Sequence, residues 1–170
     1  MPLSSAASVS IAGAQSVSLA QGKATFPFGL SRSVSLADGT GAGKADRVWT
    51  ATRTLAASAS EDLDLAGVLT DAFGATVSFA KIKALMVSAA PGNVNNVIVG
   101  GASSNGFITW VGGATHTVTV RPGGALALMA GDADATGYAV TAATGDLLKI
   151  ANSGSGTSVT YSIAIIGTSA

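Results

Sequence analysis

Apolar and polar side chains alternate with a period of two along most of the chain after residue 45. The last segment is the clearest example, since Tyr161, Ile163 and Ile165 alternate with Ser162 and Ala164. In an extended chain every second side chain points to the same side. The alternation therefore predicts a β-strand with one buried face and one face in water.

A shorter segment just before it has the same pattern. Residues 146–151 place Leu148 and Ile150 on one face and Lys149 on the other. The glycine- and serine-rich residues 152–158 join the two segments, so this region predicts a hairpin loop between two neighbouring strands.

Another pair of strands is predicted around residues 117–128. Threonine and valine alternate up to Val120, and the Pro-Gly-Gly sequence at 122–124 then precedes Leu126 and Leu128. Proline fixes φ and glycine accepts positive φ, so this tripeptide predicts a turn that ends one strand and starts the next.

Between residues 74 and 89 the apolar positions change from odd to even. The odd positions are Val77 and Phe79, and the even ones are Ile82, Ala84 and Met86, with Lys81 and Lys83 on the other face. A one-residue change of register turns core side chains outward, so the sequence predicts a β-bulge or a corner near Ala80.

These patterns together favour an all-β fold. About nine or ten short strands are expected after residue 45, at the spacing typical of sandwiches and barrels. No convincing amphipathic helix is found, although residues 61–71 have room for a helical turn or two. Because two sheets must bury one face against each other, we expect a double-sheet β-sandwich, with the jelly roll as the preferred topology.

The first 45 residues are organised differently and are interpreted as an extended N-terminal arm, with residues 46–170 as the body. The pattern SVSIA or SVSLA occurs three times at irregular offsets, which is typical of short extended pieces and not of a solenoid. The glycine-rich residues 38–44 predict a flexible joint. If the arm lies over a neighbouring subunit, strand addition would bind it, with apolar anchors at Val9, Ile11, Val17, Leu19, Phe26, Phe28, Val34 and Leu36.

The stretch PGNVNNVIVGG at residues 91–101 predicts a corner followed by a short strand. Asparagine bonds to nearby backbone and tolerates left-handed conformations, whereas glycine adopts positive φ without strain. The asparagines are therefore interpreted as corner residues, and Gly100 and Gly101 as the end of a four-residue strand.

Composition narrows the classes of function. Nine basic and nine acidic residues cancel, so the chain lacks the basic character that nucleic-acid binding requires. It contains no cysteine, and therefore neither disulfides nor thiolate metal sites. Neither a signal peptide nor an apolar run long enough to cross a membrane is recognised, which favours synthesis in a cytoplasm and no membrane partner.

Candidate catalytic groups are few, and we expect no enzyme, no cofactor and no strong metal site. His116, the only histidine, is expected at the core rim where a strand starts. The sequence GTGAGK at 39–44 has Asp38 and Ala45 where a phosphate-binding loop needs glycine and Ser or Thr. Asp132 and Asp134 have the spacing of a calcium loop but lack its closing glutamate, which leaves a weak calcium site as an alternative.

Two further groups of residues are candidates for chemistry or binding: the acidic residues of the segment 61–65 and the aromatic residues. Glu61, Asp62 and Asp64 alternate with leucines, which indicates the outer face of a strand rather than a catalytic carboxylate pair. The aromatic side chains are scattered, so packing in the core or at an interface is favoured over a sugar-binding platform.

Several segments resemble the small virion structural proteins of tailed bacteriophages and prophages. They are residues 37–69, 73–87, 92–102, 121–128 and 145–169, about three quarters of the chain. The resemblance implies a β-sandwich component of the particle, most plausibly a capsid decoration or cement protein, of a class that is commonly trimeric and binds the major capsid lattice. It brings no catalytic residues, and the first 36 residues match least well.

Three hypotheses follow. The first is a capsid decoration protein on the virion surface, synthesised in the cytoplasm of a bacterial host. The second is a tail, baseplate or fibre module that contacts a receptor. The third is a carbohydrate-binding or adhesin module, which would call for an aromatic platform or dependence on calcium.

Overall fold

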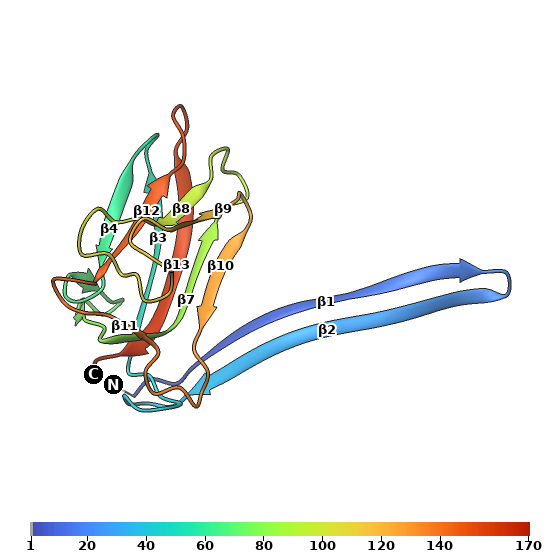
Figure 1. Cartoon of the computed structure of the whole chain (residues 1–170), viewed down its shortest axis with the longest axis horizontal. Helices are drawn as coiled ribbons and strands as arrows, with labels where there is room; N and C mark the ends of the chain where they lie inside the picture. The colour runs from blue at the N-terminus through green and yellow to red at the C-terminus, as the bar shows by residue number, and fades with distance from the viewer. Residues whose placement is uncertain (1) are drawn as a thin grey trace.

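The computed structural model describes residues 2–170 and shows an all-β protein with two distinct parts (Figure 1). A long hairpin of β1 (Ser5–Leu19) and β2 (Gly22–Leu36) projects from the body. The remaining strands, β3 to β13, form the body, and both ends of the chain lie near the base of the hairpin. No helix occurs in the described residues, so the helical turn considered for residues 61–71 is replaced by strand, turn and strand.

The body is a sandwich of two antiparallel sheets, as the alternating pattern predicts. One sheet has the order β10-β7-β13-β3, with β11 also paired to β7, and the other has the order β4-β12-β8-β9. The strands of the first sheet are β3 (Arg47–Leu55), β7 (Lys81–Ala89), β10 (Ala125–Met129), β11 (Tyr138–Ala139) and β13 (Val159–Thr168). Those of the second are β4 (Ser60–Asp64), β8 (Val97–Gly100), β9 (Thr117–Val120) and β12 (Leu147–Asn152).

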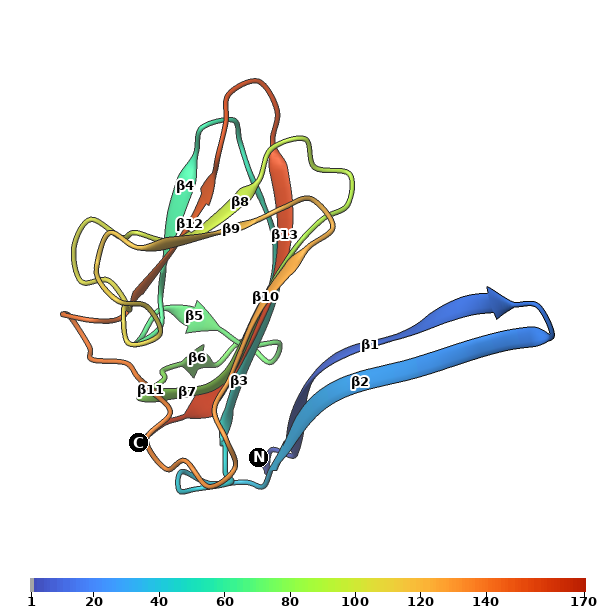
Figure 2. The same ribbon diagram turned by 45° about the vertical axis from the view of Figure 1, so that its right-hand side comes forward.

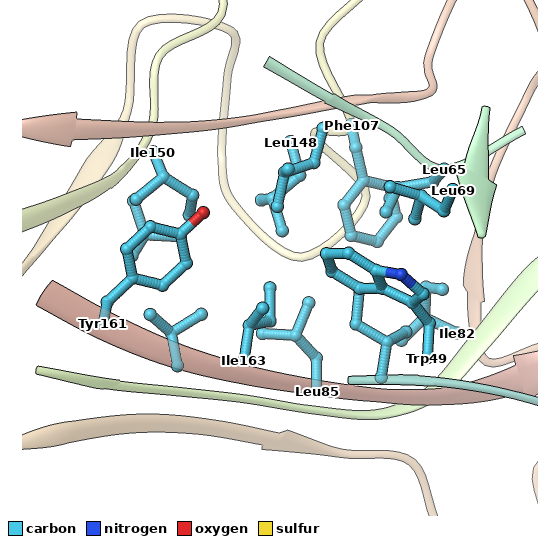
Figure 3. Packing of buried hydrophobic residues seen from close by; sticks show 14 of the residues in the cluster. Trp49, Leu65, Leu69, Ile82, Leu85, Phe107, Leu148, Ile150, Tyr161 and Ile163 are labelled. Carbon is cyan, nitrogen blue, oxygen red and sulfur yellow. The ribbon is translucent and has the colours of Figure 1, made fainter. Parts of the chain in front are cut away.

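The core lies between the two sheets. Tyr161, Ile163 and Leu85 point from the first sheet toward Leu148 and Ile150 of the second (Figure 3). The predicted alternation in the last strand is confirmed, since its odd positions are buried. β5 (Leu69–Thr70) and β6 (Thr76–Val77) form a small hairpin of their own. It closes the end of the core that lies toward the base of the β1–β2 hairpin (Figure 2).

The predicted hairpin between the last two long strands is wrong. β12 pairs with β4 and β8, whereas β13 pairs with β3 and β7, so residues 153–158 cross from one sheet to the other. The Pro-Gly-Gly turn is confirmed, with a 2.8 Å hydrogen bond from Gly124 N to Arg121 O, and it too connects strands of different sheets. Glycine-rich connections of this kind fit either geometry, so composition alone does not reveal the sheet of the next strand.

The predicted irregularity near Ala80 is present as a bend at Ala80 and a bulge at Lys83. In the pairing of β13 with β7, Ile166 is opposite Ala84 and the next residue, Gly167, is opposite Ile82. Lys83 is therefore the extra residue of the bulge. As a result Ile82 is buried in the core, whereas Ala84 and Met86 lie on the outer face. The expectation that all three face the core is therefore wrong, because the bulge at Lys83 returns the buried positions to odd numbers inside β7.

The asparagine-rich stretch forms a corner, as predicted. Asn93 both donates to Thr160 O and accepts from Thr160 N, each at 2.8 Å, so its amide pairs with β13 as a backbone group would. Asn95 donates to the buried Asn152 at 3.0 Å, which ties two loops together at the end of the sandwich away from the hairpin. Gly100 and Gly101 end β8 with positive φ values of 99° and 74°.

Candidate interaction surface

The N-terminal hairpin is the feature that distinguishes this chain from a plain sandwich. Its strands have 15 residues each, with Ser5 paired to Leu36 at the base and Leu19 paired to Gly22 at the tip. At about 3.4 Å per residue such a ribbon is about 50 Å long. The arm expected from the sequence is therefore a hairpin in which β1 and β2 satisfy each other's backbone groups, so each strand is available to another chain only along its outer edge.

The two faces of the hairpin have opposite character. Directly paired residues of an antiparallel ribbon lie on the same face, so the register assigns every side chain. We call one side the apolar face: it carries Ala7, Val9, Ile11, Gly13, Gln15, Val17 and Leu19 of β1 and Ala24, Phe26, Phe28, Leu30, Arg32, Val34 and Leu36 of β2. The other side, the serine face, carries Ser8, Ser10, Ser16, Ser18, Ser31, Ser33 and Ser35 among its residues.

The base of the apolar face is attached to the body. Val34 and Leu36 are 7% and 2% exposed and form a cluster with Ala45, against which Met129 and Ile166 pack. The sequence suggests Val34 and Leu36 as anchors for another chain. In the structure they are not free to bind one, because the body itself covers them. Asp46, at the start of the body, accepts a 2.8 Å hydrogen bond from Ser169 N and secures this junction to the C-terminal strand.

Beyond the base, the hairpin leaves the sheet (Figures 1 and 2). The large side chains of its apolar face are exposed there. A groove of about 210 Å³ marks the point of departure, lined by Val9 of the hairpin and by Met86, Ala127 and Ile166 of the sheet. The other predicted anchors lie in this exposed part: Val9, Ile11, Val17, Leu19, Phe26 and Phe28. Leu30, 73% exposed, belongs to the same face and was missed, although its even position in the strand matches that of Phe26 and Phe28.

The end of the Phe28 ring lies over the opposite strand. A Cβ atom at its partner Gly13 would come within 2.7 Å of the Phe28 ring. Glycine at this place therefore lets the ring rest on the backbone, a known way of supporting an aromatic side chain over a strand glycine. The backbone at Gly13 thus supports the Phe28 ring within the hairpin.

One cluster of titratable groups lies at the edge of the core. Tyr161 OH donates to Glu61 Oε1 at 2.8 Å, and Arg53 Nη1 donates to Glu61 Oε2 at 2.7 Å. Arg53 also lies over the ring of Trp49, 5.6 Å from its centroid. Glu61 was expected on the outer face with Asp62 and Asp64, but it lies on the inner face of β4 with Leu63. Burial, and then the carboxylate of Glu61, raise the pKa of Tyr161 well above its usual value.

The loop at residues 131–137 uses its polar groups internally. Asp134 Oδ1 accepts hydrogen bonds from Thr136 N at 2.7 Å and Gly137 N at 3.1 Å, and these bonds lower the pKa of Asp134. The side chain of Lys83, 1% exposed, donates to the carbonyl oxygen of Asp134. A buried ammonium group beside this loop opposes the binding of a calcium ion at Asp132 and Asp134 by electrostatic repulsion.

The remaining sequence candidates stay separate. His116 immediately precedes β9, as predicted, but its side chain is exposed and does not lie at the rim of the core. Residues 39–44 form a compact loop closed by a 3.0 Å bond from Ala37 N to Gly43 O, and β3 follows it where a phosphate loop needs a helix. In the part of the chain that the structure describes, no three His, Cys, Asp or Glu side chains are grouped to hold a metal. None of its segments is a helix of the length and hydropathy that a membrane span requires.

Comparison of the chain with protein-family models, with curated proteins and with solved structures finds no match.

Proposed function

We propose that this protein is a non-enzymatic virion structural protein of a tailed bacteriophage, and that it is a capsid decoration or cement protein. It binds the major capsid lattice on the outside of the head and stabilises the shell. The observation that carries the proposal is the exposed apolar face of the hairpin, which begins on the body and continues to Leu19 and Gly22 at the tip. An exposed apolar surface of this extent is typical of a protein that functions in an assembly.

The outer face of the body supports a role on a surface exposed to water. Thr52 bonds to Ser162 and Thr54 bonds to Thr160, each at 2.9 Å, so hydroxyl groups pair across β3 and β13. Such a face is hydrated without many charges, which fits the 11% charged residues of the chain.

The titratable groups that come together favour a structural role over a catalytic one. Glu61 is bonded to both Arg53 and Tyr161, and Asp46 to Arg47 and Ser169. A general acid or base needs a free position beside a substrate, whereas these carboxylates are bonded to neighbouring side chains.

The jelly-roll topology belongs to the same proposal. Successive body strands alternate between the sheets at β3–β4, β7–β8, β9–β10 and β12–β13, and the order β10-β7-β13-β3 opposite β4-β12-β8-β9 supports it. Jelly rolls are frequent among capsid proteins, an argument from fold analogy. The homotrimer that the resemblance implies stays a prediction.

Imaging of the particle tests the proposal. Virions are purified from the host, and the protein is located with a labelled antibody in electron micrographs. Many copies on the head are the expected result. A few copies on the tail would contradict the decoration role and favour a baseplate or fibre module. Absence from the particle, together with binding to a glycan array, would favour the adhesin hypothesis.

Deletion of residues 1–36 tests the part played by the hairpin. The body retains its own core, so we expect a soluble fragment that occupies fewer sites on heads lacking the native protein. The deletion also uncovers Met129 and Ile166 on the body, which the hairpin base normally covers. A control variant therefore replaces Val9, Ile11 and Phe26 by serine in the full chain and keeps the hairpin base in place. Undiminished occupancy in both variants would exclude the hairpin from binding.

A further inference from the structure

The exposed part of the apolar face is a sheet surface without a covering layer. A two-stranded ribbon is marginally stable by itself, and a sheet normally buries its apolar side against another layer. In the described chain only the base of this face is covered, by Met129 and Ile166. The seven large side chains beyond the base, from Val9 to Leu30, are 43–73% exposed.

We propose that the covering layer is the same face of a second copy of this chain, packed in the antiparallel sense about a two-fold axis. The axis passes between the rows of Phe26 and Phe28, so that Phe28 of one copy faces Phe26 of the other. The exposed face runs from the Val9–Arg32 pair to the Leu19–Gly22 pair, and its midpoint falls between these two phenylalanine rows. In the free protein this arrangement overlays the whole exposed face of each copy, and the dimer has to open before the same face can bind a capsid lattice.

The sizes of the side chains fit this register. The β2 strands of the two copies lie over each other, so Leu30 of one copy faces Ala24 of the other and Arg32 faces Gly22. The β1 strands do the same, so Gln15 of one copy faces Gly13 of the other. Three of the six pairs thus place a larger residue over a smaller one, which helps two layers to interdigitate at close packing. Ile11 over Val17 and Val9 over Leu19 complete the rows with apolar pairs.

Charge favours the antiparallel sense. Arg32 is the only charged residue on the apolar face, since Lys23 belongs to the serine face. In a parallel arrangement about a two-fold axis the two Arg32 side chains would lie in the same row, diagonally across from each other, and like charges that close are destabilising. In the antiparallel one they lie ten residues apart along the ribbon, about 33 Å at the usual rise per residue.

The area is sufficient for a specific dimer. Seven large apolar side chains that are about half to three-quarters exposed leave on the order of several hundred Å² per copy, the scale of the roughly 800 Å² per partner in a standard interface. Each hairpin also remains attached to its own body at Val34 and Leu36, so dimerisation requires no refolding. Ordering Phe28 costs little conformational entropy, because its ring already rests on Gly13.

Molecular mass in solution tests the association. We expect the full chain to be a dimer by sedimentation velocity at micromolar concentration. Phe26→Glu and Leu30→Glu should each raise the dissociation constant at least about tenfold, because each places a charge in the buried layer. Thr25→Glu and Ser31→Glu are matched controls on the neighbouring positions of the serine face and should leave the dimer unchanged. A monomer at all concentrations or equal effects of both pairs would overturn the proposal. A trimer, the competing assembly that the resemblance implies, would overturn it as well.

Cross-linking tests the register. The chain has no cysteine, so single substitutions provide unique thiols. Leu30→Cys and Ala24→Cys are co-expressed and treated with a bis-maleimide that spans about 10 Å, the separation of stacked sheets. We expect a Leu30→Cys to Ala24→Cys cross-link, whereas either variant alone should not cross-link to itself. Self-cross-linking of each variant without the mixed product would indicate a parallel pairing and overturn the antiparallel register. This test is independent of whether the protein belongs to a virion, so the two proposals can fail separately.

Discussion

Tyr161 and Glu61 connect the two sheets of the sandwich through a 2.8 Å hydrogen bond, although they are 100 residues apart in sequence. Tyr161 belongs to β13 and Glu61 to β4, so the bond crosses the edge of the core. Arg53, from the strand beside β13, neutralises the same carboxylate. A buried phenol and a partly buried carboxylate are thereby both satisfied at one site, which is the condition for keeping polar groups next to an apolar core.

Replacing Tyr161 by phenylalanine should lower the free energy of unfolding by about 1–2 kcal/mol, because Glu61 loses a hydrogen-bond donor where water enters poorly. Urea denaturation followed by tryptophan fluorescence measures the change. Tyr138→Phe is the matched control, since Tyr138 is the only other tyrosine and is partly buried. An equal loss in both variants would show that the bond to Glu61 contributes nothing specific.

The raised pKa of Tyr161 predicts a loss of stability in alkali. The unfolded phenol ionises near pH 10, whereas the folded one stays protonated to higher pH. The folded state therefore binds one more proton above pH 10, and the stabilisation that is complete below that pH falls by about 1.4 kcal/mol per pH unit above it. The difference in stability between wild type and Tyr161→Phe should shrink from pH 9 to pH 11. A constant difference would contradict the pKa shift.

Gly100 should not tolerate a side chain. Its φ is 99°, and a Cβ atom there would lie 2.7 Å from the carbonyl oxygen of His116. We expect Gly100→Ala to destabilise the protein by about 2 kcal/mol or more, through backbone strain and displacement of the start of β9. Gly92→Ala, in open space at the other end of the same corner, should change stability by less than about 0.5 kcal/mol. Thermal unfolding of both variants checks this contrast.

Leu36 should control the hairpin separately from the body. Leu36→Ala removes a buried side chain from the cluster that contains Val34 and Ala45, outside the main core. The cost, about 2 kcal/mol or more, should appear as faster hydrogen exchange in β1 and β2 while peptides of β7 and β13 remain protected. Thr25→Ala, exposed on the serine face, serves as the control. Faster exchange throughout the body would mean that hairpin and body unfold together.

The sequence was informative where one strand face is buried and the other is not. The alternation around Tyr161 and Ile163 placed the last strand and its inner face correctly, because a period of two has a single interpretation when one side is wet. Gly100 was assigned to a strand end on conformational grounds that its positive φ confirms. Asn93 lies at a corner as predicted, but its amide bonds Thr160, 67 residues away, instead of nearby backbone. Conformational preference can therefore be recognised locally, whereas the partner of a side chain cannot.

Long-range pairing was less accessible. The loop before Val159 has the composition of a hairpin, yet it joins two sheets, since the partner of each strand depends on contacts distant in sequence. The pairing of the two hairpin strands was also missed, because the two-residue turn at Ala20 and Gln21 lacks the usual Asn-Gly or Gly-containing centre. The signal that remained was the repeated SVSLA on either side of that turn, at 16–20 and 33–37.

One side of the hairpin carries hydroxyl groups and the other carries hydrocarbon side chains. Because of this division, the hairpin can be lengthened or shortened without mixing the two sides. Inserting or removing two residues in each strand moves the tip by about 7 Å, and all the remaining side chains stay on their original side. A lineage could thus extend or shorten its reach by small genetic steps, without any compensating change in the sandwich that carries it.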